Sequence, residues 1–246
     1  MNFVYYFILV FQITTLGGNV KVSVQNNIVF GWNIKTHIAV TELALKENVI
    51  LSRVEKRMLG RFSQMPDLMR EELRDMNSGH FYDVLHEDPS FGIINDKKNN
   101  ALYRFLEHTG KALKRVNREH FLREIGYAVH YLQDVTTPPH TEHGNYFHKF
   151  FRIPMHKSFE KGKKYGASSH LKQLNNDYVP EEIPFNSLKS LLHNTALFSV
   201  QSENQVNYLN KKNWYEIQSR CFNRGVNVSK AYLNYILQFI PQANLK

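Results

Sequence analysis

Apolar residues recur along most of this chain at the three- and four-residue spacing that places them on one face of a helix. The segment 120–135 is apolar nearly throughout and is expected to be a buried helix. Strand-like alternation never extends beyond a few residues. The pattern therefore predicts an all-α fold, a single compact multi-helix domain, with helices over residues 36–50, 98–116, 120–135, 155–165, 186–206 and 213–240.

The eight prolines lie mainly between the predicted helices, where the missing backbone N–H is tolerated. Two long connections, residues 60–80 and 136–155, are expected to be irregular. Long connections in a compact domain are often functional, which directs attention to the side chains that these two segments carry.

An apolar run at the N-terminus differs from the amphipathic segments. Phe3–Phe11 is too short to span a bilayer as a helix, but it has the length of a signal-peptide core, and Gly17 and Gly18 follow it. The two residues before the run carry no basic side chain. We expect residues 1–18 to be a signal peptide and the protein to be secreted, extracellular or periplasmic; an uncleaved anchor is the alternative.

Composition narrows the candidate chemistry. The chain contains one cysteine, Cys221, and twelve histidines, so no intrachain disulfide can form and a bound metal would need imidazole and carboxylate ligands. Lys and Arg number 31 against 22 Asp and Glu, a net charge of +9. A basic surface favours anionic partners such as phospholipid headgroups, nucleic acid or phosphate esters, without selecting among them.

Two histidine–carboxylate pairs have helical spacing. His130 and Asp134 lie four residues apart and share one helix face, as do His156 and Glu160. A single pair of this kind usually stabilises a helix surface. Between the two pairs, a Pro-Pro dipeptide ends the first helix and His140 follows it closely. Two pairs with a histidine turn between them favour a shared cation.

Further candidates lie upstream. Asp67 and His80 fall in the first long connection, and Trp32 is followed five residues later by His37. Each of these residues alone is most simply a core or capping residue. Their order along the chain, together with the two pairs, gives them more weight.

In that order the residues resemble the trinuclear zinc site of the bacterial zinc-dependent phospholipases C. The matched positions are Trp32, His37, Asp67, His80, His130, Asp134, His140, His156 and Glu160. The most specific element is His-Tyr-x-x-Asp-x-x-x-Pro-x-His at residues 130–140. Residues 161–246 resemble the family only in being helical.

The resemblance implies up to three zinc ions and a role for each residue. One zinc would be held by Asp67, His80, His130 and Asp134. A second would be held by His140, His156 and Glu160. A third would be held by His37, by Asp134 as a bridging ligand and by the backbone of Trp32. In the family this tryptophan is the mature N-terminus, so residues 19–31 would be a propeptide-like segment and residues 32–246 the catalytic domain.

The resemblance also implies a reaction. A phospholipase C cleaves a glycerophospholipid into diacylglycerol and a phosphorylated headgroup. Clustered divalent cations neutralise phosphate oxygens and lower the pKa of a bound water, so that hydroxide is available near neutral pH. Asp67 would accept the proton of that water as general base. The expected partner is a phospholipid substrate at a membrane surface, and we expect a monomer without an obligate protein partner.

Three departures bear on the substrate. Leu68 and Asn77 stand where the family's choline pocket has aromatic residues, so choline selectivity is not expected. The toxin members of the family carry a C-terminal β-sandwich that binds membranes, for which this chain leaves no room. The spacing between Trp32 and His37 is closer to that of the related single-strand-specific zinc nucleases.

A zinc nuclease or nucleotidase, with nucleic acid as its partner, is therefore the main alternative. Four aromatic residues, Phe81, Tyr82, Tyr146 and Phe147, are candidates to stack on bases. Lining of an acyl or headgroup groove and simple packing are the other roles open to them. Against this alternative, Glu160 stands where the nucleases resemble one another in using aspartate, and Cys221 alone cannot form their disulfides. A metal-stabilised helical binding protein without turnover is a third interpretation.

Overall fold

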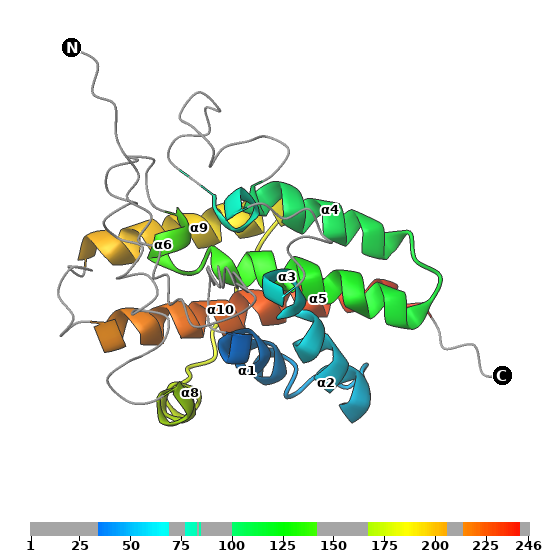
Figure 1. The fold of residues 1–246 in the computed structure, drawn as a ribbon, viewed down its shortest axis with the longest axis horizontal. Helices are drawn as coiled ribbons and strands as arrows, with labels where there is room; N and C mark the ends of the chain where they lie inside the picture. The colour runs from blue at the N-terminus through cyan, green and yellow to red at the C-terminus, as the bar shows by residue number, and fades with distance from the viewer. Residues whose placement is uncertain are drawn as a thin grey trace, which may run out of the picture.

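Helices form the regular structure of the computed structural model, which describes residues 34–68, 77–82, 84, 100–141, 167–205 and 214–241 (Figure 1). No residue in those ranges belongs to a β-strand, and the predicted all-α fold is confirmed. The α-helices are α1 (Ile34–Ala44), α2 (Arg53–Phe62), α3 (Met65–Leu68), α4 (Ala101–Leu113), α5 (Arg118–Asp134), α6 (Pro138–Thr141), α8 (Ala167–Asn176), α9 (Leu188–Gln205) and α10 (Trp214–Ile236). The 3-10 turns are η1 (Asn77–His80) and η5 (Leu237–Phe239).

The four longest helices follow the hydrophobic pattern. α4, α5, α9 and α10 occupy the predicted segments with ends that shift by a few residues. The helix expected over residues 36–50 is shorter and ends at Ala44; beyond it, the Asn48 side chain accepts hydrogen bonds from the backbone N–H groups of Ile50 and Leu51 and stabilises a turn. The helix predicted over 155–165 and the N-terminal segments 1–18 and 19–31 lie outside the described residues.

Two short helices, α3 and α6, occupy connections that we expected to be irregular. α2 ends at Phe62, inside the segment 60–80, and α3 follows it there. α6 begins at Pro138, and proline is well suited to the first position of a helix. A capping box marks the start of α2, because Ser52 accepts from the backbone N–H of Glu55 while Glu55 accepts from the backbone N–H of Ser52. This start signal was readable in the sequence.

Helix α5 lies at the centre of the arrangement. It packs most extensively against α4, also contacts α2 and α10, and reaches α1, α3 and η1 through smaller contacts. Figure 1 shows α4, α5, α9 and α10 running side by side as long helices, with α1 and α2 beside α5 and α10. Every residue from Glu124 to Asp134 is buried, which explains why this helix is apolar nearly all round.

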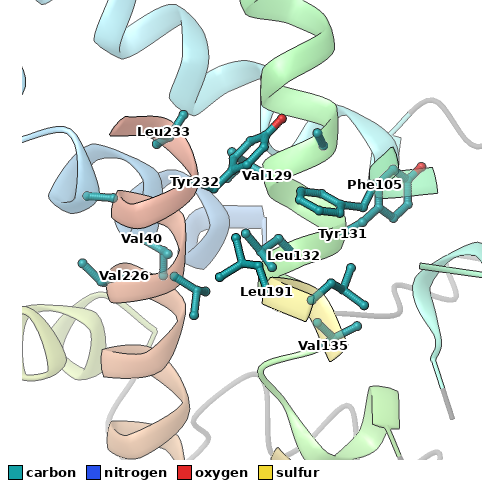
Figure 2. Packing of buried hydrophobic residues seen from close by; sticks show 14 of the residues in the cluster. Val40, Phe105, Val129, Tyr131, Leu132, Val135, Leu191, Val226, Tyr232 and Leu233 are labelled. Carbon is teal, nitrogen blue, oxygen red and sulfur yellow. The ribbon is translucent and has the colours of Figure 1, made fainter. Parts of the chain in front are cut away.

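The core joins α5 to its neighbours through aliphatic and aromatic side chains. Figure 2 shows Leu132 of α5 facing Leu191 of α9 and, across the interior, Val226 of α10 and Val40 of α1. Each fully buried side chain of this kind contributes about 1.5–3 kcal/mol relative to exposure. Cys221 is a free, buried thiol within this core, and burial raises its pKa, so it acts as a small apolar residue.

No described helix is both long enough and apolar enough to cross a membrane.

Gly126 permits the closest approach between α2 and α5. A Cβ atom at position 126 would lie 3.0 Å from the carbonyl carbon of Phe62 and closer still to the Phe62 side chain. Because backbone atoms cannot move aside as a flexible side chain can, only glycine fits here. This contact matters for function because the chain continues from Phe62 directly into the segment that carries Asp67.

We expect Gly126→Ala to lower the free energy of unfolding by about 1–3 kcal/mol, the usual cost of overpacking. Gly110→Ala is the matched control, because Gly110 is also helical but nothing lies within 4 Å of its added Cβ. The control should be neutral or raise the free energy of unfolding by up to about 1 kcal/mol. Chemical denaturation measures both, and equal shifts in the two variants would contradict the close-approach argument.

Candidate metal centre

Histidine and aspartate side chains from five elements converge beside the C-terminal half of α5. The predicted ligands that the structure describes are His37 of α1, Asp67 of α3, His80 of η1, His130 and Asp134 of α5, and His140 of α6. The side chains of His37, Asp67, His80, His130 and Asp134 are at most 1% exposed, and His140 is buried as well. Trp32, His156 and Glu160 lie outside the described residues.

Asp134 lies in the middle of this cluster. Its Oδ1 is 3.4 Å from Nε2 of His37, and its Oδ2 is 2.6 Å from Nδ1 of His80 and 3.1 Å from Nε2 of His130. His130 and Asp134 are one turn apart on α5, so the helix itself aligns them. The carboxylate of Asp134 thus contacts three imidazoles that approach from three different elements.

Asp67 of α3 lies near two of the same imidazoles, those of His37 and His130. Its Oδ2 is 3.8 Å from Nε2 of His37, and its Oδ1 is 4.0 Å from Nε2 of His130. Two sets of ligand atoms result, each with its members within 4.8 Å of one another. The first set is His37, His130 and Asp134; the second is Asp67, His80 and His130.

The outer nitrogen of three rings is held by a carbonyl oxygen. Nδ1 of His37 donates to Oε1 of Gln133 at 2.7 Å, and Nδ1 of His130 donates to the backbone oxygen of Ser63 at 2.8 Å. Nδ1 of His140 donates to the backbone oxygen of His80 at 2.7 Å. A neutral imidazole that donates from Nδ1 carries its lone pair on Nε2, which is the arrangement of metal-binding histidines.

The electrostatics of the cluster favour the protonation states that a metal ion needs. Burial lowers the pKa of His37 to about 3, with the neighbouring His130 acting in the same direction and Asp134 opposing it. Burial opposes ionisation of Asp134, but His130 and His140 outweigh it and hold its pKa well below the usual range. A neutral His37 and an ionised Asp134 are therefore the forms present near pH 7.

His130 differs from His37. Burial opposes its protonation, but the carboxylates of Asp134 and Asp67 outweigh this effect and raise its pKa. The two buried carboxylates thus favour a positive charge beside this ring. A divalent cation would supply that charge, and its binding requires the unprotonated imidazole.

The donor atoms fit a cation of the zinc type. Within the described residues, His37 Nε2 and Asp134 Oδ1 are buried and have no hydrogen-bond partner, although burial of such atoms without a partner is costly. They are 3.4 Å apart. Tetrahedral zinc with bonds of 2.0–2.1 Å holds its ligand atoms about 3.3 Å apart, so one cation would satisfy both atoms.

The segment around His140 is fixed by aromatic neighbours. Phe81 stacks on the His140 ring with centroids 4.8 Å apart, and the backbone N–H of Tyr82 donates to the His140 carbonyl. Tyr82 is only 3% exposed, and its hydroxyl is 3.0 Å from Nδ1 of His193 on α9. Tyr82 is therefore a core residue and is not available to stack on a nucleotide base; Tyr146 and Phe147, two further candidates for that role, lie outside the described residues.

Two supporting residues, Gln133 and Ser63, were missed by the sequence analysis. Gln133 adjoins Asp134 in a helix expected to be buried, and a buried glutamine needs polar partners, so this signal was available. Ser63 acts through its backbone oxygen, which any residue has, so no sequence signal existed.

A second buried histidine–carboxylate pair joins His108 of α4 to Glu124 of α5. His108 donates from Nδ1 to Glu124 at 2.8 Å, and Glu124 also accepts from Arg115. This pair belongs to the packing of α4 on α5 and provides a control for experiments on the cluster.

Comparison with known proteins supports the fold. The sequence matches no family model, and a search of curated proteins finds no match. Two alpha toxins are among the solved structures that are similar to this chain. The alpha toxin of Clostridium absonum has a TM-score of 0.60 and 15% identity over 89% of this chain and 67% of the toxin. The Clostridium perfringens alpha toxin has a TM-score of 0.57 and 17% identity over 88% of this chain and 66% of the toxin. The chain thus shares an all-α fold with these toxins and spans about two thirds of their length.

The geometry predicts that zinc stabilises the protein through Asp134. A ligand that binds only the folded state stabilises it by about 2.7 kcal/mol at 100 times its dissociation constant, so zinc should raise the melting temperature and a chelator should reverse the effect. Asp134→Asn should abolish the rise. Glu124→Gln, which removes the carboxylate of the other buried pair on α5, should retain it. A zinc-dependent rise that survives in Asp134→Asn would contradict this assignment.

Proposed function

We propose that the protein is a zinc-dependent phosphodiester hydrolase, and specifically a phospholipase C that releases diacylglycerol and a phosphorylated headgroup. The observation that carries the proposal is the buried cluster in which Asp134 contacts His37, His80 and His130. The fold shared with two clostridial alpha toxins supports it, because the family that the sequence motif resembles includes toxins.

The buried histidine and aspartate side chains are the reason for proposing a metal-dependent reaction. Bound divalent cations supply positive charge for the phosphate oxygens and lower the pKa of a coordinated water. His37 and His130 present Nε2 toward Asp134, and the outer nitrogen of each is already occupied by a carbonyl. The ligands are therefore oriented before a cation arrives, which limits reorganisation on binding.

Asp67 is the proposed general base. Its carboxylate lies 3.8 Å from His37 Nε2 and 4.0 Å from His130 Nε2, close to both ligand sets but farther from each imidazole than Asp134 is. From this position the Asp67 carboxylate would accept a proton from the attacking water.

The remaining ligands are proposed on the sequence motif alone. His140, His156 and Glu160 would hold a second zinc. Trp32 would complete a third site with His37 and Asp134 if the chain is cut after Gly31. The apolar run near the N-terminus supports secretion as part of the same proposal, with the substrate at a membrane surface.

The substrate is tested by a side-by-side assay with vesicles of phosphatidylcholine, vesicles of phosphatidylethanolamine, and single-stranded nucleic acid. We expect zinc-dependent release of diacylglycerol, abolished by a chelator and restored by zinc. Because Leu68 replaces an aromatic residue of the choline pocket, the protein should hydrolyse phosphatidylcholine no faster than phosphatidylethanolamine. Release of nucleotides without diacylglycerol would overturn the phospholipase proposal in favour of a nuclease. Zinc binding without turnover of any substrate would favour a binding protein.

The role of Asp67 is tested by Asp67→Asn, which keeps the shape of the side chain but removes its basicity. We expect turnover to fall by at least about 100-fold, because general base catalysis typically contributes 10²–10⁴. The zinc content, measured by elemental analysis, should remain close to that of the unaltered protein. If zinc is lost together with activity, Asp67 is mainly a ligand rather than the base.

A further inference from the structure

Gln133 is a completely buried polar residue at a position for which the family motif specifies no residue type. It adjoins Asp134 on α5, and its side chain points into a polar network between α1, α2 and α10 rather than into the apolar core. The network consists of hydrogen bonds from Gln133 to His37 and Thr41 of α1 and to Ser229 of α10.

The donor and the acceptor of each hydrogen bond in this network follow in turn from Ser63, the residue farthest from Gln133. The hydroxyl of Ser63 donates its single proton to a backbone carbonyl, that of Gly60 at 2.8 Å or of His37 at 3.2 Å. Its oxygen therefore accepts from the hydroxyl of Thr41, at 3.0 Å. Because the Thr41 proton is used in this way, its oxygen must accept from the amide of Gln133, at 2.9 Å.

These directions fix the orientation of the Gln133 amide. Its NH₂ group faces Thr41 and also donates to Ser229 at 3.2 Å, so its carbonyl oxygen faces His37. That oxygen can only accept, and the 2.7 Å contact therefore requires a proton on Nδ1 of His37. Consequently Nε2 of His37 carries the lone pair, and this is the nitrogen that lies 3.4 Å from Oδ1 of Asp134.

We propose that Gln133 is the positioning residue of the metal centre, which selects the Nδ1–H tautomer of His37 and aims its Nε2 at the cation held with Asp134. This inference rests on the proposed zinc site. Two consecutive residues of α5 thus lie at the two nitrogens of one imidazole: Gln133 accepts a hydrogen bond from Nδ1, and Oδ1 of Asp134 lies 3.4 Å from Nε2. An amide provides the acceptor without adding another charge to a buried site that already contains two carboxylates.

The network also links His37 to another residue of its own helix. Thr41 lies one turn along α1 from His37, and the same amide bonds both residues. Ser229 of α10 accepts from the same amide at 3.2 Å, a longer hydrogen bond than those to His37 and Thr41. Loss of the amide would free the ring to rotate and to adopt the other tautomer.

The test uses the full chain and two variants that separate orientation from packing. Gln133→Met has a similar length but offers no acceptor to His37. Ser229→Ala removes another hydrogen bond of the same amide and leaves the bond to His37 intact. Outer hydrogen-bond partners of metal ligands typically contribute 10–100-fold to metal affinity. We expect one zinc equivalent to bind 10–100 times more weakly in Gln133→Met and within twofold of normal in Ser229→Ala, as measured by competition with a chelating dye.

The tautomer provides a readout that does not require metal. In the zinc-free, ¹⁵N-histidine-labelled protein, two-bond nitrogen–proton correlations should show the His37 proton on Nδ1, with the signal assigned by its loss in His37→Gln. A proton on Nε2 in the unaltered protein would overturn the inference even if Gln133→Met failed to fold. Equal zinc affinity in Gln133→Met, or an equal loss in Ser229→Ala, would overturn it as well.

Failure of the proposed function gives a different result. If the unaltered protein bound no zinc, the zinc site itself would be refuted. The tautomer spectrum of the unaltered protein would then still decide whether Gln133 orients His37.

Discussion

The structure of the candidate site depends on how the buried negative charge of Asp134 is compensated. An isolated charge in such a position is strongly unfavourable, so it must be compensated by partners of opposite charge or by a metal ion. His37, His80 and His130 surround it, and each comes from a different element. Burial opposes ionisation of the carboxylate, but His130 and His140 outweigh this effect and hold the pKa of Asp134 well below its usual range. The helices of this half of the molecule thus meet at one buried negative charge.

The packing around α5 explains how so many polar groups reach that charge without disrupting the core. α5 is buried over its C-terminal half, and Leu132 is directed to the apolar side (Figure 2). Gln133 and Asp134 instead contact polar side chains of α1 and η1. The close contact at Gly126 brings α2 near, and the backbone oxygen of Ser63 at the end of α2 then holds His130. Shape complementarity between helices therefore places the hydrogen-bond acceptors that orient the imidazoles.

The similarity to the clostridial alpha toxins supports the fold, and the pattern of histidines and carboxylates independently supports the proposed metal site. The structural likeness extends over most of this chain at 15–17% identity, which is informative about fold and not about substrate. The pattern of histidines and carboxylates is local and chemical. The structural likeness therefore supports the fold, and the histidine and carboxylate pattern supports the proposed metal-dependent reaction. The burial of Tyr82 removes one of the aromatic side chains that a nuclease would use to contact bases.

Much of the fold and part of the candidate site could be predicted from the sequence alone. Helical periodicity predicted α4, α5, α9 and α10, since their apolar residues repeat with the helix itself, and the spacing of His130 and Asp134 placed both on one face because that relation is local. Asp67, His37 and His80 could be named only through a resemblance, because their distance to α5 depends on contacts far apart in sequence. Only the tertiary structure decided that Gln133 supports His37 and that the Ser63 backbone supports His130. Hydrogen bonds between distant segments depend on how the helices pack, and no local pattern of residues encodes that packing.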